Sequence, residues 1–216
     1  MPNPARPSLT PRKRPRQARA AVTVDAIFEA TIQLLIRSGA DSLTTTRVAE
    51  RAGVSVGTLY QYFPNKQALI YALNERYLET LAAKIEATCT AQNGQPASTM
   101  LKALIDAYWR AKTERPEVTR ALYRSVADLD NSALIEAFAS RVDTATTAMF
   151  ASACDADFAD LASVNLTLVT VIFGTVRNVF ERGLDSQDAE KLQGQLCLMC
   201  DAYLKALDGS SIAQPR

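Results

Sequence analysis

Residues 44–63, TTTRVAERAGVSVGTLYQYF, gather the side chains of this chain that are best suited to molecular recognition. Hydroxyl groups, arginines and two tyrosines recur through the segment at short intervals. Such groups hydrogen-bond to phosphate oxygens and to the edges of bases. The chemistry that this segment offers is therefore the reading of a nucleic acid, provided that the backbone presents these groups on one surface.

The spacing within the segment indicates two short helices joined by a tight turn. Ala49 is small where two helices must approach closely, and Gly53, four residues later, allows the positive φ that ends a helix abruptly. Ser55 is a suitable N-cap for a second helix over residues 56–62, whose inward residue is Leu59. This is the sequence form of a helix-turn-helix, in which the second helix enters the major groove of DNA.

The surroundings of the motif make it more specific. Residues 27–73 resemble the DNA-binding domain of the tetracycline-repressor (TetR) family, most specifically at residues 57–69, GTLYQYFPNKQAL. The rest of the chain matches that family only in length and helical character. The resemblance implies an all-α fold of about nine helices, with an N-terminal helix-turn-helix domain and a helical ligand-binding and dimerisation domain.

The resemblance also implies which residues contact DNA. These residues lie in the two helices of the motif and at the start of the next helix, and they would contact phosphates, the groove and base edges. They are Thr45, Thr46, Arg47, Ser55, Val56, Gly57, Thr58, Tyr60, Tyr62 and Lys66. Blander interpretations stay open for several of them. Tyr60 and Tyr62 can be packing residues with hydrated hydroxyls, and Gly57 can be a tolerated surface glycine instead of a point of close approach to DNA.

Charge is divided unevenly along the chain. The net charge is only +1, but residues 1–66 carry ten Lys/Arg and four Asp/Glu, or +6, and the remainder carries −5. Much of the excess lies in a Pro-rich segment, residues 1–22, in which Arg14 and Arg16 are candidate DNA contacts. We expect a disordered basic arm in the free protein, which can enter the minor groove when DNA is bound.

No residue pattern indicates an enzyme, a metal site or a cofactor. The chain has no histidine, no glycine-rich phosphate loop and no nucleophile motif. Cys197 and Cys200 have the CxxC spacing but lack a second pair, so buried small hydrophobes are favoured over a thiol sensor. With no secretory leader and no disulfide framework, we expect a cytoplasmic protein. Residues 161–176 are uncharged but short and partly polar, which favours a buried helix over a membrane span.

Helical periodicity continues through the rest of the chain, without strand-like alternation. A first helix is predicted over residues 24–38, and the helices after the motif at 66–89, 97–114, 117–127, 131–152, 157–182 and 186–207. The predicted domains are an arm (1–22), a helix-turn-helix domain (23–66), a ligand-binding and dimerisation domain (67–208) and a flexible tail (209–216).

The helices at 157–182 and 186–207 carry apolar residues on more than one face. Each such face needs a partner. The resemblance implies that a second copy of the chain supplies it, in a two-fold interface of four helices.

A small-molecule pocket is implied by the resemblance, framed by the central helices. The candidates are large or polar groups in apolar helices: Tyr108, Trp109, Phe138, Phe150, Asn165, Phe173 and Arg177. Arg177 can bind an anionic group, pair with Glu181 or face solvent. The function predicted is a homodimeric repressor that binds a palindromic operator and is released by a hydrophobic effector. The alternative is a DNA-binding regulator without an effector, constitutive or thiol-responsive.

Overall fold

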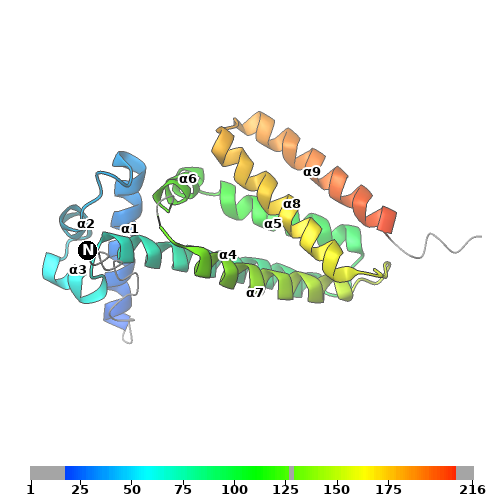
Figure 1. The fold of residues 1–216 in the computed structure, drawn as a ribbon, viewed down its shortest axis with the longest axis horizontal. Coiled ribbons are helices and arrows are strands. Elements are labelled where there is room, and N and C mark those ends of the chain that lie inside the picture. Colours follow the sequence, from blue (N-terminus) through cyan, green and yellow to red (C-terminus); the bar gives the residue numbers. More distant parts are fainter. Residues whose placement is uncertain (1–17, 127–128, 208–216) are drawn as a thin grey trace, which may run out of the picture. The chain divides into compact units, whose positions relative to one another are not determined.

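The computed structural model describes residues 18–126 and 129–207, and these form nine helices without a strand (Figure 1). This all-α architecture is the predicted fold class. The helices are α1 (Ala18–Ser38), α2 (Thr45–Ala52), α3 (Val56–Tyr62), α4 (Lys66–Gln92), α5 (Ala97–Thr113), α6 (Pro116–Ser125), α7 (Ser132–Ala151), α8 (Leu161–Arg182) and α9 (Ser186–Leu207).

The helices group into two compact units. We call residues 18–78 and 117–134, less 127–128, the head, and residues 79–116 and 135–207 the body. The predicted domain boundaries remain predictions, and the compact units divide the chain differently from them. Helix α6 belongs to the head because Val118 and Leu122 are buried in the head's core cluster, and Tyr77 shares a hydrogen bond with Thr119 at 3.1 Å.

The head has a core of apolar side chains from α1 to α4 and α6. Ile27, Val48 and Leu59 are completely buried at its centre, where they hold the two helices of the motif against α1. Phe28 packs on Phe63 with ring centroids 5.6 Å apart. This core fixes α2 and α3 as a rigid pair, which is the requirement for presenting side chains on one surface.

Two helix starts differ from the sequence prediction. Helix α1 begins at Ala18 and not at residue 24, because the run of residues 18–22, ARAAV, is rich in alanine, the strongest helix former. Helix α8 begins at Leu161 and not at residue 157. Asp160 caps it, accepting a hydrogen bond from the backbone N–H of Ser163 at 3.1 Å, and residues 156–158 are irregular instead of helical. The other predicted bounds agree within a few residues.

In the body, α5, α8 and α9 contact one another, and α7 is tied to α4 (Figure 1). The guanidinium of Arg141 donates two hydrogen bonds of 2.7 Å to the carboxylate of Glu86. Between α9 and α5, Gln193 donates to Asp106 at 2.9 Å. The buried faces of α5 and α8 supply most of the body's large apolar side chains, including Leu104, Leu168 and Ile172.

Helix α8 is long and apolar enough to cross a membrane, judged by length and composition alone. The uncharged run of residues 161–176 is only part of this helix, which ends at Arg182 as the sequence predicted. A core helix satisfies the same criteria. Here Val164, Leu168 and Val176 are buried within the body, so packing against α5 and α9 accounts for part of the apolar composition.

Candidate functional site

The start of α2 is set by a side-chain cap. Thr44 is extended, and its hydroxyl accepts a hydrogen bond from the backbone N–H of Arg47 at 3.2 Å. Thr44 and Thr46 are exposed, and Thr45 is half-buried. The first turn of α2 therefore places hydroxyl groups and the positive end of the helix dipole at the surface, an arrangement suited to a phosphate.

The turn between α2 and α3 is specified by its own residues. Gly53 has φ +69°, and the N–H of Val54 donates to the carbonyl of Ala49 at 3.0 Å, which closes α2 in the manner of a Schellman motif. Ser55 then caps α3 by accepting from the N–H of Thr58 at 2.9 Å. Two caps within three residues fix the angle at which α3 leaves α2.

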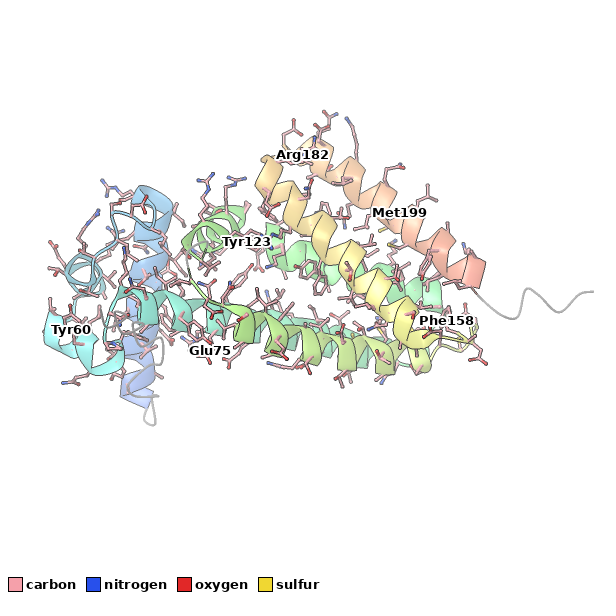
Figure 2. All side chains as sticks on the ribbon, viewed as in Figure 1. Tyr60, Glu75, Tyr123, Phe158, Arg182 and Met199 are labelled. Carbon is pink, nitrogen blue, oxygen red and sulfur yellow. The ribbon has the colours of Figure 1, made fainter. Side chains whose placement is uncertain are left out.

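Helix α3 presents one buried and one polar face. Leu59 is completely buried, whereas Ser55 and Gly57 are exposed and Thr58 is half-buried. Tyr60 is also exposed (Figure 2 labels it). The hydroxyl of Tyr60 lies 3.1 Å from that of Thr45, so α2 and α3 share one polar surface. The structure brings these predicted contacts together on one side of the motif.

Val56 and Tyr62 are placed differently from the rest of the predicted contacts. Both are half-buried and pack against the core cluster of the head, and the Tyr62 ring lies 6.2 Å from that of Phe63. Packing therefore accounts for at least part of each side chain. Arg14 and Arg16 lie outside the described residues.

Gly57 has no structural reason to be a glycine. Its φ is not positive, and a Cβ added to it would meet only Ser55 Oγ, at an ordinary contact distance of 3.7 Å. Neither backbone conformation nor packing within the chain requires the missing side chain. The remaining explanation is contact with another molecule, because a backbone without a side chain allows a partner to approach closely.

Two predicted cationic contacts are engaged within the head. Arg47 donates to the carbonyl of Ser42 at 2.6 Å and to the hydroxyl of Ser38 at 3.3 Å, and Lys66 donates to the carbonyl of Ala40 at 3.2 Å. These bonds secure the connection between α1 and α2. For either side chain to bind a phosphate, it must exchange or share these intramolecular bonds.

Sequence reasoning missed Gln61, which is exposed on α3 beside Tyr60. Gln61 follows Gly57 by four residues, so both lie on one helical face. Glutamine binds adenine through two hydrogen bonds in the major groove. Its spacing of four residues from Gly57 could have indicated from the sequence that Gln61 lies on the same face of the helix.

Three of the predicted ligand-binding aromatics meet in the body. Tyr108 on α5 stacks on Phe173 on α8, with ring centroids 3.9 Å apart and planes inclined by 13°. Phe138 on α7 lies 5.8 Å from Phe173. Trp109 and Phe150 are also buried.

The same cluster contains a lysine that sequence reasoning missed. The side chain of Lys112 is among the most completely buried large side chains of the described chain, and its ammonium lies 5.6 Å from the centroid of the Tyr108 ring. Burial, and then the like charge of Arg177, lower the pKa of Lys112 to about 7. Its position four residues after Tyr108 on an amphipathic helix could have indicated from the sequence that Lys112 lies on the same face as that ring.

Arg177 pairs with Glu181, the second of the alternatives left open by the sequence. Its Nε donates to a Glu181 carboxylate oxygen at 2.6 Å, and its side chain is 63% exposed. Asn165 is the contrasting case, because it is buried and its Oδ1 has no hydrogen-bond partner among the described residues. A buried acceptor without a donor costs free energy, so a ligand carrying a donor would stabilise it.

The two cysteines of the CxxC pair differ in exposure, because Cys200 is buried and Cys197 is half-buried. Cys200 is buried and its pKa is raised to about 11 by burial and by the proximity of Cys197, whose own pKa burial also raises. Because the thiolate is the reactive form of cysteine, the raised pKa values disfavour a thiol sensor at this pair. Within the described ranges, no cluster of three or more potential metal ligands occurs.

Helices α8 and α9 also expose large apolar side chains. Leu166 is 62% exposed on α8, and Leu198 and Met199 are 64% and 53% exposed on α9 (Figure 2 marks Met199). Gly174 and Gly194 are exposed in the same helices, with no atom within contact distance of an added Cβ. We call the surface formed by these five residues the α8–α9 face.

The arrangement of a capped helix pair with an exposed polar recognition helix defines a helix-turn-helix DNA-binding protein. Two family models agree with this class. "Bacterial regulatory proteins, tetR family" matches residues 27–73, and "Tetracyclin repressor-like, C-terminal domain" matches residues 96–204. The chain belongs to the tetR family of bacterial regulatory proteins.

Curated relatives share part of the sequence. The HTH-type transcriptional repressor KstR of Mycolicibacterium smegmatis is 35% identical over 107 residues, which is 50% of this chain and 52% of that protein. The nucleoid occlusion factor SlmA of Haemophilus ducreyi is 35% identical over 109 residues, 50% of this chain and 53% of that protein. The chain thus spans about half the length of these curated relatives.

Solved structures resemble the whole fold. A putative TetR-family regulator from Mesorhizobium loti superposes with a TM-score of 0.72 at 17% identity, covering 89% of this chain and 100% of that one. The fatty acid degradation regulator FadR from Bacillus halodurans gives 0.61 at 16% identity, covering 85% and 97%. At these identities the likeness shows the fold alone.

Proposed function

We propose that this protein is a transcriptional repressor that binds a palindromic operator as a homodimer and is released by a small-molecule effector. The observation that carries the proposal is the polar surface shared by α2 and α3. It is built from exposed groups on a rigid core, and Gly57 leaves room there for a partner's close approach. The relative named a transcriptional repressor, KstR, supports repression as the outcome.

The homodimer is supported by the α8–α9 face. Exposed apolar residues on two adjacent helices, with glycines that permit close helix approach, are typical of a surface that another helix pair covers. A two-fold axis through that face would pair α8 and α9 with their copies. Two recognition helices would then reach successive major grooves about 34 Å apart.

The effector response is supported by the body's side chains. The aromatic cluster and the partnerless acceptor of Asn165 offer apolar and polar groups to a ligand. Helix α4 contributes residues to both units, so it is the element through which a bound ligand would alter the head. The ligand shifts the equilibrium by its differential affinity for the two states. The thiol-responsive alternative is disfavoured by the raised pKa of Cys200.

The test is a selection of genomic fragments with the purified protein at two salt concentrations, read by sequencing. We expect one palindromic sequence to be recovered at both concentrations, since base contacts persist when screening weakens phosphate contacts. Recovery of unrelated fragments that disappear at higher salt would refute a specific operator. Recovery of a non-repeated half-site would refute the homodimer.

A further inference from the structure

Helix α3 exposes one side chain whose hydrogen-bonding groups are unused within the described chain. Gln61 is exposed, and its amide makes no hydrogen bond to any described residue. The other exposed polar side chain of α3 is that of Tyr60, whose hydroxyl lies 3.1 Å from the hydroxyl of Thr45. Among the exposed side chains of α3, the Gln61 amide therefore offers a donor and an acceptor that are both free for a partner.

Gln61 shares its helical face with a position that lacks a side chain. It follows Gly57 by four residues, and residues four apart lie on one face. A helical side chain covers the surface on the N-terminal side of its own Cα, which for Gln61 is the turn that contains Gly57. Only Ser55 Oγ lies within 4 Å of a Cβ added to Gly57, so the side chain of Gln61 does not fill this space.

A free amide in the major groove suits one base better than the other three. Its carbonyl can accept a hydrogen bond from the N6 amino group of adenine while its amino group donates to N7. Guanine presents two acceptors at these positions, so the amide carbonyl would face the O6 of guanine without a hydrogen bond. Cytosine and thymine each offer a single hydrogen-bonding group there. An amide that reaches the base edges from α3 therefore favours adenine.

We propose that Gln61 binds one adenine in each half-site of the operator, and that Gly57 is a positioning residue for this contact. The glutamine side chain is short, so its amide reaches a base edge only if the backbone of α3 enters the groove closely. A Cβ at Gly57 would lie between the helix and the DNA and would hold the helix back. This inference rests on the proposed function, in that it names a base that the proposed repressor recognises.

The test is a selection from DNA duplexes with a fully randomised core, carried out in parallel with the full chain and its variants and read by sequencing. The wild type should enrich a sequence with an adenine at a fixed position of each half-site. Gln61→Ala should lose at least about tenfold in the preference for that adenine and keep the preferences at other positions. Gln61→Glu should shift the preference toward cytosine, whose N4 amino group donates to a carboxylate.

Two further variants separate the contact from indirect effects. Gln187→Ala, at an exposed glutamine on α9, is the matched control and should enrich the wild-type sequence. Gly57→Ala should reduce the preference for the same adenine, and adding Gln61→Ala to it should cause little further loss, because residues that act as a unit are not additive. Gln61→Ala should melt at the wild-type temperature, since the residue is exposed. A large drop in melting temperature would show that Gln61 is a packing residue.

The other outcomes distinguish this inference from the proposed function. If wild type and Gln61→Ala enrich the same palindrome with equal strength, operator binding stands and the Gln61 contact is refuted. A loss of preference for a base other than adenine also refutes it, and an unchanged preference in Gly57→Ala removes the positioning role. If the adenine depends on Gln61 in a sequence without a two-fold repeat, the contact is supported and the homodimer is refuted. If the wild type enriches no sequence, the specific operator and the contact are both refuted.

Discussion

Gly57 carries the sharpest argument at the scale of single residues. A helix interior normally disfavours glycine, and nothing within the chain occupies the place of its missing side chain. A residue that costs stability and serves no packing role points to a function outside the folded chain. The neighbouring Gly53 is its counterpart, because its φ of +69° requires glycine for the turn itself.

We therefore expect Gly57→Ala to raise the free energy of unfolding by roughly 0.5–1 kcal/mol and to weaken operator binding about tenfold. Gly53→Ala should instead lower stability, by about 1 kcal/mol, through strain at a positive φ. Chemical denaturation and gel shift measure the two effects. A Gly57→Ala protein with unchanged operator affinity would return Gly57 to the class of tolerated surface glycines.

Lys112 gives a second prediction at this scale, in the pH dependence of stability. Its folded pKa is about 7, whereas an unfolded lysine has a pKa near 10.4. Between these values the unfolded chain binds the extra proton, so stability rises with pH. The free energy of unfolding of the wild type should rise relative to that of Lys112→Met from pH 7 to pH 10. Below pH 6, the difference between the two proteins should not change with pH.

Denaturant unfolding of both proteins at pH 6, 8 and 9.5 measures this difference in free energy. The contributions of the titratable groups that both proteins contain cancel in the difference. A constant difference across that range would mean that Lys112 keeps an ordinary pKa in the folded protein.

At the scale of elements, α8 and α9 are buried on one side and apolar on the other. Val164, Leu168 and Ile172 face the body's interior, whereas Leu166 is 62% exposed. Sequence periodicity indicated apolar residues on more than one face of these helices. It did not distinguish which of them the chain itself covers, because that depends on where α5 lies.

Leu198→Lys should convert the protein from dimer to monomer, since a charge in an apolar interface is strongly unfavourable. Its melting temperature at low protein concentration should change little, because the residue is 64% exposed in the single chain. Ile135→Lys, at a 49% exposed apolar position on α7, is the matched control and should stay dimeric. Light scattering during size-exclusion chromatography reports the mass. A Leu198→Lys dimer would place the interface elsewhere.

Much of the head could be predicted from sequence because its signals are local. Thr44, Gly53 and Ser55 determine helix ends through bonds to residues three or four positions away, and Gly53 and Ser55 act where the sequence analysis expected. The predicted start of α1, at residue 24, was too late because the alanine-rich residues before it extend the helix back to Ala18.

The candidate body site was less predictable because it depends on distant residues. Tyr108 and Phe173 are 65 positions apart, and no spacing rule brings them to 3.9 Å. Lys112 was overlooked because lysine is normally exposed, and its burial follows from the packing of α5 among other helices. Asn165 was selected as a polar residue in an apolar helix, which is the one sequence signal that a buried polar group leaves.

At the scale of the whole molecule, charge is concentrated near one end of the chain. Five of the ten Lys/Arg of residues 1–66 lie in residues 1–17, which carry no acidic residue, so residues 18–66 have a net charge of only +1. The described residues of this N-terminal part of the chain are therefore nearly neutral in sum. Long-range attraction to DNA must then come mainly from the first 17 residues.

Deleting residues 1–17, which leaves α1 intact, should weaken binding to all DNA and flatten the dependence of log affinity on log salt by up to about 4 units. The preferred operator sequence should not change, because the base contacts that we propose lie on α2 and α3. Titrations at several salt concentrations, on operator and on scrambled DNA, measure both quantities. An unchanged slope would show that the segment does not contact phosphates.

The division of labour within α3 has an evolutionary consequence. Leu59 alone is fully buried there, and Gly57, Tyr60 and Gln61 are exposed while the caps at Gly53 and Ser55 hold the backbone in place. Mutations at the exposed positions can change which DNA sequence the protein prefers, with little effect on folding. A duplicated copy of this gene could therefore acquire a new set of target promoters in a few single-residue steps, each one folded and available to selection.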